Sequence, residues 1–258
     1  MRIKKVDLTW NDSEVLPDKI RPDVDYLFSR MNEATISMVD PRPGDRILDV
    51  GCGRATDIVA MSKYGAVVIG VEPSFVMLSY ARDSLKLDGY RTDVLQAIGE
   101  SIPVARGSID KVVCKGALDH FADPDGAIRQ MSFAIRPGGS AVIAVANFES
   151  LGFKIGKFIF WLRKLLRIRN PYKRLPWEPP SDHTVKLDRR SIVDMLQKHM
   201  EVQKVMGVSM LCSMPGWGDM LARFPKSFSR RVLASLNRIS RRMPGLSDVV
   251  IVRCTSRQ

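Results

Sequence analysis

The sequence predicts an α/β fold: a doubly wound, mostly parallel sheet of seven strands with helices on both faces. Three observations indicate this fold. Short apolar stretches alternate with helix-like stretches from residue 46 onward, the first strand runs into a glycine-rich turn, and no repeat or low-complexity tract interrupts the chain. Strands that alternate with helices predict a parallel sheet covered on both faces. Ligands of such folds bind at the carboxyl ends of the strands.

The elements follow in a regular order. A helix is expected at 23–38, with apolar side chains at helical spacing, and the Asp-Pro-Arg-Pro-Gly stretch at 40–44 ends it. Five strands that alternate with helices are then expected at 46–50, 67–71, 94–98, 110–114 and 140–146. A later helix is expected at 187–200, and two more strands at 202–211 and 248–253.

These elements predict one domain with two insertions. The 45% apolar content is ample for a buried core. Residues 1–39 are expected to form an N-terminal arm and helix, and residues 40–147 the core. Residues 148–186 form a basic amphipathic insertion. Residues 187–258 complete the core and contain a second helical insertion at 212–245.

The most informative segment is residues 46–56 (RILDVGCGRAT), an apolar strand followed by a glycine turn and a helix. Gly51 and Gly53 let the backbone turn sharply and approach a ligand closely. The helix directs its free N–H groups toward the same place. A second strand ends at Glu72, about twenty residues on, where a carboxylate can accept hydrogen bonds from both hydroxyls of a ribose. This order and spacing predict a nucleoside-binding half-site.

Five segments resemble the motifs of the class I S-adenosylmethionine (SAM)-dependent methyltransferases, in the small-molecule, type 11-like branch. The resemblance covers roughly residues 40–147. In motif order the segments are ILDVGCG at 47–53, VEPS at 71–74, IGESIP at 98–103, GSIDKVV at 107–113 and IRPGGSAVI at 135–143. Two positions depart from the family pattern. Ala55 replaces the third glycine of the first motif, and Ile98 stands where Asp is common.

The resemblance implies a Rossmann-like methyltransferase fold in which strands six and seven form an antiparallel hairpin, here split by a helical excursion. It also implies that SAM is the cofactor. Asp49 is expected near the amino-acid part of SAM and Glu72 at the ribose. Further contacts are expected from the glycine turn, the start of the third helix and the ends of the third and fourth strands. They are Gly51, Cys52, Gly53, Pro73, Ser74, Met77, Ile98, Gly99, Glu100, Lys115 and Gly116. Glu100 is alternatively a cap of the turn that follows it.

Three residues are candidates for the methyl-acceptor side of the site. His120 and Asp119 follow the fourth strand, and His183 closes the first insertion. A hydroxyl acceptor needs a general base more than a free amine does. Each candidate also has a structural interpretation, as a loop or capping residue, and His199 is expected to be structural. Spacing along the chain predicts no metal site, because no His, Asp or Glu cluster has ligand spacing.

The net charge of +12 is concentrated in the two insertions. Residues 151–176 hold eight Lys or Arg and no acid, and residues 213–244 hold seven against one acid. The rest of the chain is nearly neutral, with 25 basic and 27 acidic residues. On a helical wheel, residues 151–169 place Ile155, Phe158, Ile159, Leu162, Leu165 and Leu166 opposite Lys157, Arg163, Lys164 and Arg167. Residues 226–243 place Phe228, Val232, Leu236, Ile239 and Met243 opposite five arginines.

Three interpretations of these basic helices remain open. They could pack their apolar faces on the core, lie on an anionic membrane surface, or bind nucleic acid. Nucleic acid is the least favoured partner, because the aromatic side chains lie on the apolar face and are not interleaved with the basic residues. Both insertions are also expected to form a lid over the acceptor pocket.

The sequence therefore predicts a SAM-dependent methyltransferase with a small or amphiphilic acceptor, such as a quinone, an isoprenoid, a lipid-like molecule or a secondary metabolite. The alternatives are an RNA methyltransferase and a SAM-binding, membrane-associated partner protein without methyl transfer. A cytoplasmic location is expected, with peripheral attachment to the inner face of the membrane as a hypothesis. Four scattered cysteines, no signal peptide and no long uncharged apolar run support that expectation.

Overall fold

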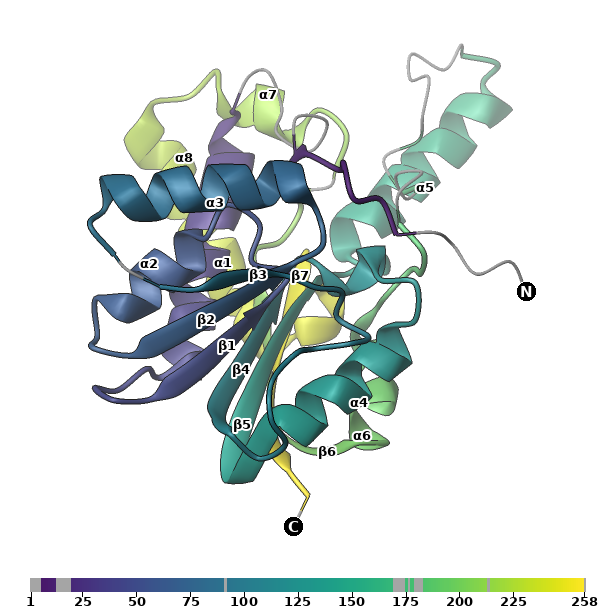
Figure 1. Cartoon of the computed structure of the whole chain (residues 1–258). Coiled ribbons are helices and arrows are strands. Elements are labelled where there is room, and N and C mark those ends of the chain that lie inside the picture. The colour runs from purple at the N-terminus through teal and green to yellow at the C-terminus, as the bar shows by residue number, and fades with distance from the viewer. Residues whose placement is uncertain are drawn as a thin grey trace.

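The computed structural model describes residues 6–12, 20–90, 92–168, 175, 177–178, 183–212 and 214–257. A seven-stranded sheet crosses the molecule in the order β3-β2-β1-β4-β5-β7-β6 (Figure 1). The strands are β1 Arg46–Val50, β2 Val67–Glu72, β3 Val94–Gln96, β4 Ile109–Lys115, β5 Ile135–Ala146, β6 Met200–Val208 and β7 Val249–Ser256. Neighbouring strands from β1 to β5 pair in parallel, and β7 is antiparallel to both β5 and β6. The predicted fold class and the split hairpin are confirmed.

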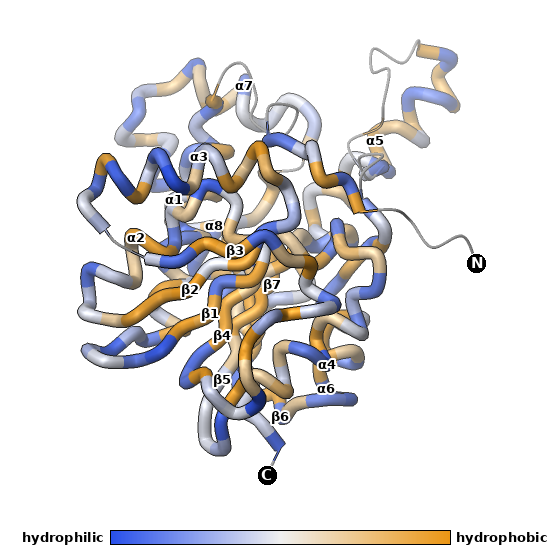
Figure 2. The backbone as a smooth tube through the Cα atoms, viewed as in Figure 1, coloured by the Kyte–Doolittle hydropathy of each residue, from blue (hydrophilic) through white to orange (hydrophobic). Residues whose placement is uncertain are grey.

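Helices cover both faces of the sheet. The helices are α1 Pro22–Val39, α2 Thr56–Ser62, α3 Phe75–Leu87, α4 Pro124–Ala134, α5 Leu151–Leu165, α6 Arg189–Gln197, α7 Trp217–Leu221 and α8 Lys226–Arg242, with short 3₁₀ turns η2 Leu118–His120 and η3 Pro244–Leu246. Side chains of β1 alternate between the two faces. Leu48 and Val50 pack in the cluster that contains α4 and α6, whereas Ile47 packs with α1, α2 and α3. Burial on both sides explains why the central strands are the most apolar part of the chain (Figure 2).

Several element boundaries differ from the predicted ones. The strand β5 begins at Ile135 and not at residue 140, because the Pro-Gly-Gly stretch is a bulge inside the strand. Gly139 is required there, since a Cβ atom would lie 2.6 Å from the carbonyl oxygen of Asp110. The helix α6 is shorter than expected because Asp188 and Ser191 form a capping box at its start.

The second insertion packs on the body of the protein through a face that differs from the predicted apolar one. The buried residues of α8 are Ser229, Leu233, Asn237 and Ser240, whereas Phe228, Ile239 and Met243 are exposed. Small polar side chains let this helix approach β6 closely. The N–H of Ser209 donates to Asn237 Oδ1 at 2.9 Å, and Ser240 Oγ donates to the carbonyl oxygen of Gly207 at 3.3 Å. These hydrogen bonds rotate the helix away from the orientation that hydrophobicity alone predicts.

The first insertion behaves differently, because α5 projects away from the sheet (Figure 1). Within α5, whose residues are all described, only Gly152 and Gly156 are buried. A Cβ atom at Gly156 would lie 3.1 Å from Trp177 and 3.2 Å from Pro215, so close packing is confined to the base of the helix. The interpretation that this helix packs its apolar face on the core is therefore wrong. Among the described residues, no helix combines the length and apolarity needed to cross a bilayer.

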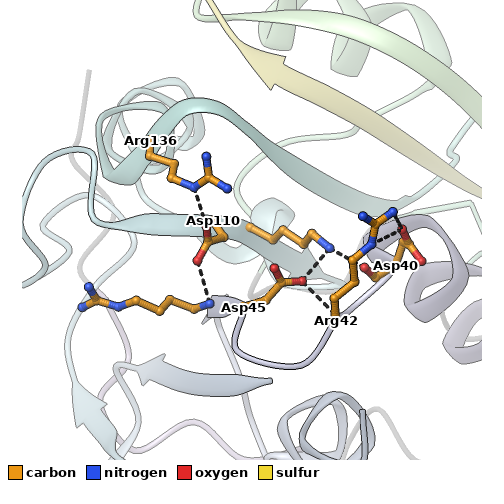
Figure 3. A network of polar contacts seen from close by, with 7 residues as sticks. Asp40, Arg42, Asp45, Asp110 and Arg136 are labelled. Atoms are coloured by element: carbon orange, nitrogen blue, oxygen red, sulfur yellow. Dashed lines mark hydrogen bonds and ion pairs between the residues drawn. The ribbon is translucent and has the colours of Figure 1, made fainter. Parts of the chain in front are cut away.

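A network of charges fixes the turn between α1 and β1 at the amino-terminal edge of the sheet (Figure 3). Asp110 accepts a hydrogen bond from the N–H of Arg46 at 2.8 Å and pairs with Arg136. Lys111 pairs with Asp45 at 2.7 Å, and Asp45 also accepts the N–H of Arg42 at 2.8 Å. The N–H of Arg46 and the guanidinium of Arg136 lower the pKa of Asp110 below its ordinary value. The glycine turn and Glu72 lie at the opposite, carboxyl ends of the strands.

Neutralising Asp110 is expected to destabilise the protein at neutral pH. A lowered folded-state pKa means that the stabilisation is present above the ordinary Asp pKa, about 4, and is lost as the pH falls through the lower folded value. Asp110→Asn should reduce the free energy of unfolding in urea by about 1 kcal/mol at pH 7, and the difference from wild type should shrink at pH 3. Asp83→Asn, an exposed change on α3, is the control. An equal loss at both pH values would contradict this account.

Candidate functional site

The glycine turn lies at the carboxyl end of β1 and is tied to β2. The N–H groups of Gly51 and Cys52 both donate to the carbonyl oxygen of Val71, at 2.8 and 3.1 Å. Gly51 and Gly53 have φ angles of 76° and 52°, in the left-handed region that favours glycine. A Cβ atom at Gly51 would lie 2.4 Å from Cβ of Ala117, so the turn also packs directly against the loop after β4.

Glu72 ends β2 with a buried carboxylate, 6% exposed, that faces the glycine turn. Its Oε2 accepts the N–H of Gly53 at 3.2 Å, and its Oε1 accepts the N–H of Ser74 at 3.0 Å. Burial raises the pKa of Glu72, and these two N–H groups and His120 partly oppose that rise. Each carboxylate oxygen retains a second lone pair, so this group can still accept bonds from two neighbouring hydroxyls.

Ala55, the position where the family pattern has glycine, keeps the glycine-like backbone. It has φ 62° and ψ 21° and is the N-cap of α2. An L-residue in this conformation costs roughly 1–2 kcal/mol. The turn geometry is therefore retained in spite of the substitution, and the surrounding structure must supply the free energy that holds it.

A buried group of charges lies beneath the turn. Lys115 Nζ pairs with Asp57 Oδ1 at 2.6 Å and donates to Asn32 Oδ1 at 2.6 Å. Burial raises the pKa of Asp49, the charge of Asp57 raises it further, and Lys115 opposes both effects. The side chain of Lys115 thus points toward α1 and α2. Its predicted cofactor role, through the backbone beside Gly116, stays a prediction.

The remaining predicted cofactor residues fall into two groups. Met77 lies beneath the turn, 3.6 Å from where a Cβ of Gly53 would be, and Pro73 precedes it in the loop after β2. Cys52, whose thiol pKa is raised by burial, faces Gly70 of β2. Ser74 Oγ accepts the N–H of Met77 at 3.2 Å and donates to the carbonyl oxygen of Trp10 at 2.6 Å.

The loop after β3 would form the other side of the predicted nucleoside half-site. Ile98 is half-buried at this edge. Gly99 is buried, and a Cβ there would lie 2.6 Å from the ring of Phe121. Glu100 Oε1 accepts the N–H of Asp123 at 2.9 Å, so its side chain caps the start of the segment that leads to α4. This hydrogen bond reaches a residue 23 positions on and not the turn that directly follows Glu100, so the predicted cofactor contact and the alternative cap of that turn both stay predictions.

The N-terminal segment 6–12 lies against the same edge, and sequence reasoning missed it. The N–H of Phe75 donates to the carbonyl oxygen of Leu8 at 3.1 Å. Asp12 forms a two-point ion pair with Arg54, at 2.6 and 2.7 Å, and the ring of Trp10 lies 5.4 Å from that of His120. A tryptophan within a polar arm was the only signal in the sequence. This segment, and not α5, covers the glycine turn. The expected role of the insertions as a lid over the acceptor pocket stays a prediction.

The three acceptor-side candidates come together beyond β4. His183 Nδ1 lies 3.1 Å from Asp119 Oδ2, and His120 Nε2 lies 4.0 Å from Asp119 Oδ1. The two imidazole rings are 4.5 Å apart and nearly perpendicular. Thr184 holds this arrangement, because its N–H donates to the carbonyl oxygen of Asp119 at 2.7 Å and its hydroxyl to that of Phe121 at 2.6 Å. The end of the first insertion therefore contributes directly to the site.

Aromatic rings lead from this cluster toward the base of α5. The ring of His183 lies 5.8 Å from that of Phe148, which stacks on Phe153 of α5 at 5.7 Å. A separate cavity of about 280 Å³ lies at the opposite edge of the sheet, beside Arg46 and Ile109. Glu72, Asp119, His120 and His183 are not among the residues that line that cavity.

Comparison with known proteins agrees with this geometry. Residues 48–143 match the family model of a methyltransferase domain. Ubiquinone biosynthesis O-methyltransferase of Escherichia coli O157:H7 is 29% identical over 123 residues, which cover 46% of this chain and 51% of that protein. Methyltransferase GfsG of Streptomyces halstedii is 32% identical over 118 residues, which cover 45% of this chain and 42% of that protein. The chain thus spans about half the length of these curated relatives or less.

A solved structure extends the likeness in fold to most of the chain. The YcgJ protein of Bacillus subtilis superposes with a TM-score of 0.59 and 17% sequence identity. The superposition covers 89% of this chain and 99% of that one. At this level of identity the likeness concerns the fold alone.

Replacing Gly51 by Ala is expected to disturb this edge more than a matched change elsewhere. Gly44 also has a left-handed backbone, with φ 83°, but no atom lies within 4 Å of its would-be Cβ. Gly44→Ala should lower the free energy of unfolding by about 1 kcal/mol. Gly51→Ala adds the collision with Ala117 and should lower it by about 3 kcal/mol. Equal losses in urea titrations would mean that the turn does not pack as described.

Proposed function

We propose that this chain, whose residues 48–143 match the family model of a methyltransferase domain, is a class I SAM-dependent methyltransferase that methylates a small or amphiphilic acceptor at the carboxyl edge of its sheet. The observation that carries the proposal is the position of two groups at that edge. The buried carboxylate of Glu72 and the cluster of Asp119, His120 and His183 lie on opposite sides of the junction between β1 and β4. This junction is the topological switch point of the sheet, where ligands of such folds bind.

The cofactor side fits the nucleoside part of SAM. Glu72 is preorganised by two backbone N–H groups and keeps acceptor capacity for the ribose hydroxyls. The glycine turn lets a ligand approach the backbone, and Ile98 offers an apolar edge beside Gly99 for a flat base. Asp49 lies below the turn, in the position proposed for the amino-acid end. SAM supplies an activated methyl group on a sulfonium; these residues bind and orient it.

On the acceptor side, Asp119, His120 and His183 are the proposed catalytic residues. They would hold the acceptor atom, and an imidazole or the carboxylate would receive its proton. The buried carboxylate of Asp119 orients His183, and Thr184 fixes both segments. Trp10 and Phe148 flank the two imidazoles, at ring distances of 5.4 Å from His120 and 5.8 Å from His183. Such apolar walls exclude water and favour a flat or apolar acceptor.

The free part of α5 supports an amphiphilic acceptor delivered from a lipid surface. Phe158, Trp161 and Leu165 are 60%, 59% and 65% exposed on a helix that stands away from the body. Lys157, Lys164 and Arg167 are exposed on the same segment, and residues 151–168 contain no acid. Apolar and aromatic side chains beside several cations suit the interface of an anionic bilayer. The ring path through Phe153 and Phe148 connects this helix with the acceptor-side cluster.

The second basic helix is proposed as an auxiliary contact with the same surface. Its packed face is occupied by β6, while Phe228, Ile239 and its arginines point outward. Each Lys or Arg near an anionic surface contributes roughly 1 kcal/mol. This helix lies on the body of the protein, so α5 is the element proposed to enter the interface.

Glu72→Gln is expected to weaken binding of S-adenosylhomocysteine (SAH), the product form of the cofactor, at least tenfold in isothermal titration. The two oxygens of a carboxylate can accept hydrogen bonds from both hydroxyls of a ribose, whereas the amide has only one acceptor oxygen. Hydrogen bonds to a charged group contribute about 1.5–3 kcal/mol. Glu201→Gln, an exposed change on β6, should leave the affinity within twofold. Unchanged affinity in the Glu72 variant would place the nucleoside elsewhere, and no binding by folded wild type would reject the proposed function.

Leu165→Glu is expected to abolish co-flotation of the protein with anionic phosphatidylglycerol-containing vesicles. It places a negative charge in the segment proposed to enter the interface. Leu87→Glu is the matched control, because Leu87 is equally apolar and 90% exposed on α3. Wild type and the control should float with anionic but not neutral vesicles, and high salt should weaken the binding. Equal loss in both variants, or binding of RNA without binding of vesicles, would contradict the proposed surface.

A further inference from the structure

We propose that Asp119, His120 and His183 form a binding site for one divalent transition-metal ion, which holds a methyl acceptor through two neighbouring oxygen atoms. This inference rests on the proposed function, since it assigns a chemical task to the acceptor side of that same site. It also explains why two histidines and a buried acid converge from segments more than sixty residues apart.

The geometry is close to that of a coordination sphere. One donor atom from each of the three side chains lies within 4.8 Å of the other two. The distance from Asp119 Oδ2 to His183 Nδ1 is 3.1 Å, and that from Asp119 Oδ1 to His120 Nε2 is 4.0 Å. Nitrogen and oxygen ligands bind Zn²⁺ at about 2.0–2.2 Å, so donors that share one ion lie roughly 3–4 Å apart. Small rotations of the imidazole rings would bring the three donor atoms to these distances.

The buried carboxylate gives a second, independent indication. The Asp119 side chain is 4% exposed, and its Oδ1 accepts no hydrogen bond within the described part of the chain. A buried carboxylate oxygen without a hydrogen-bond donor is destabilising. The distance from this oxygen to His120 Nε2 is 4.0 Å, which is beyond hydrogen-bond range. A cation between these atoms would satisfy the carboxylate.

The backbone around the three ligands is also held in place before any ion binds. The N–H of Thr184 donates to the carbonyl oxygen of Asp119 at 2.7 Å, and its hydroxyl donates to that of Phe121 at 2.6 Å. His183 therefore cannot move away from η2 without breaking them. A site whose ligands are prepositioned in this way loses little conformational entropy when the ion binds.

The donor set indicates both the kind of ion and the kind of acceptor. Two imidazoles and one carboxylate favour Zn²⁺, Mn²⁺, Fe²⁺ or Co²⁺ over Mg²⁺ or Ca²⁺, which prefer oxygen ligands. Three protein ligands leave coordination positions open. A divalent cation lowers the pKa of a hydroxyl bound to it. The site therefore fits acceptors with adjacent oxygen donors, such as 1,2-dihydroxy aromatic rings or hydroxy ketones, and these would also suit the aromatic walls.

The test is a direct measurement of metal binding. Full-length protein is freed of metal with a chelator and titrated with Zn²⁺ by calorimetry, and with Co²⁺ by visible absorption. Wild type should bind one ion per chain with a micromolar or lower dissociation constant. His183→Ala and His120→Ala should each weaken binding at least tenfold, and bound Co²⁺ should show d–d bands that these changes abolish. His120→Ala is the safer variant for folding, because the side chain of His120 is 24% exposed.

The matched control is His199→Ala, which removes another histidine that faces a carboxylate. His199 Nε2 lies 3.2 Å from Asp125 Oδ2, between the end of α6 and α4, outside the proposed site. This variant should bind the ion within twofold of wild type. Absence of ion binding by folded wild type, or an equal loss in the His199 variant, would overturn the proposal. SAH binding measured on the same samples separates the two ideas: SAH affinity without metal affinity rejects only the metal site, and loss of both rejects the proposed function as well.

Discussion

The proposed cofactor side of this protein depends on one buried carboxylate that holds two backbone segments together. Glu72 accepts the N–H of Gly53 on one side and the N–H of Ser74 on the other. These bonds stabilise a charge that burial alone would disfavour. Ser74 then caps α3 and binds the carbonyl oxygen of Trp10, so the effect of Glu72 extends to the N-terminal segment. The glycine turn, the start of α3 and the segment over them form one connected unit.

The proposed acceptor side forms in a different way, because the end of the first insertion packs back against the core. His183 lies close to the Asp119 carboxylate, Thr184 donates hydrogen bonds to the backbone around η2, and Phe148 at the other end of the insertion packs on His183. Both ends of the insertion thus lie beside the site, whereas its helix points outward. This arrangement lets a single insertion contribute to chemistry through its ends and present a basic, apolar helix at the surface.

The fold could be predicted from sequence because its signals are local, and the proposed nucleoside half-site rests on signals of the same kind. Strand periodicity, the two glycines and the acid at the end of β2 are separated by short, fixed distances, and each has a simple physical reason. The cluster of His120 and His183 could not be assigned from spacing, because only the three-dimensional fold makes the two residues neighbours. The metal site proposed here likewise has no ligand spacing along the chain, which is why the sequence predicts none.

Hydrophobicity was also a poor guide where polar packing decides the outcome. A helical wheel places the large apolar residues of α8 on its buried face, yet Asn237 and Ser240 are buried there because they bond to the backbone around β6. In α5 the packed residues are glycines, which allow close contact only near the base of the helix. The covering position of segment 6–12 depends on contacts of Trp10 and Asp12 with distant residues.

The most direct test of the central claim is a crystal structure of the protein in complex with SAH. The account predicts that the ribose hydroxyls contact Glu72, that the ligand lies between the glycine turn and the segment at 6–12, and that its sulfur faces Asp119, His120 and His183. A ligand bound at another edge of the sheet, or one whose ribose does not contact Glu72, would contradict the assignment of this site.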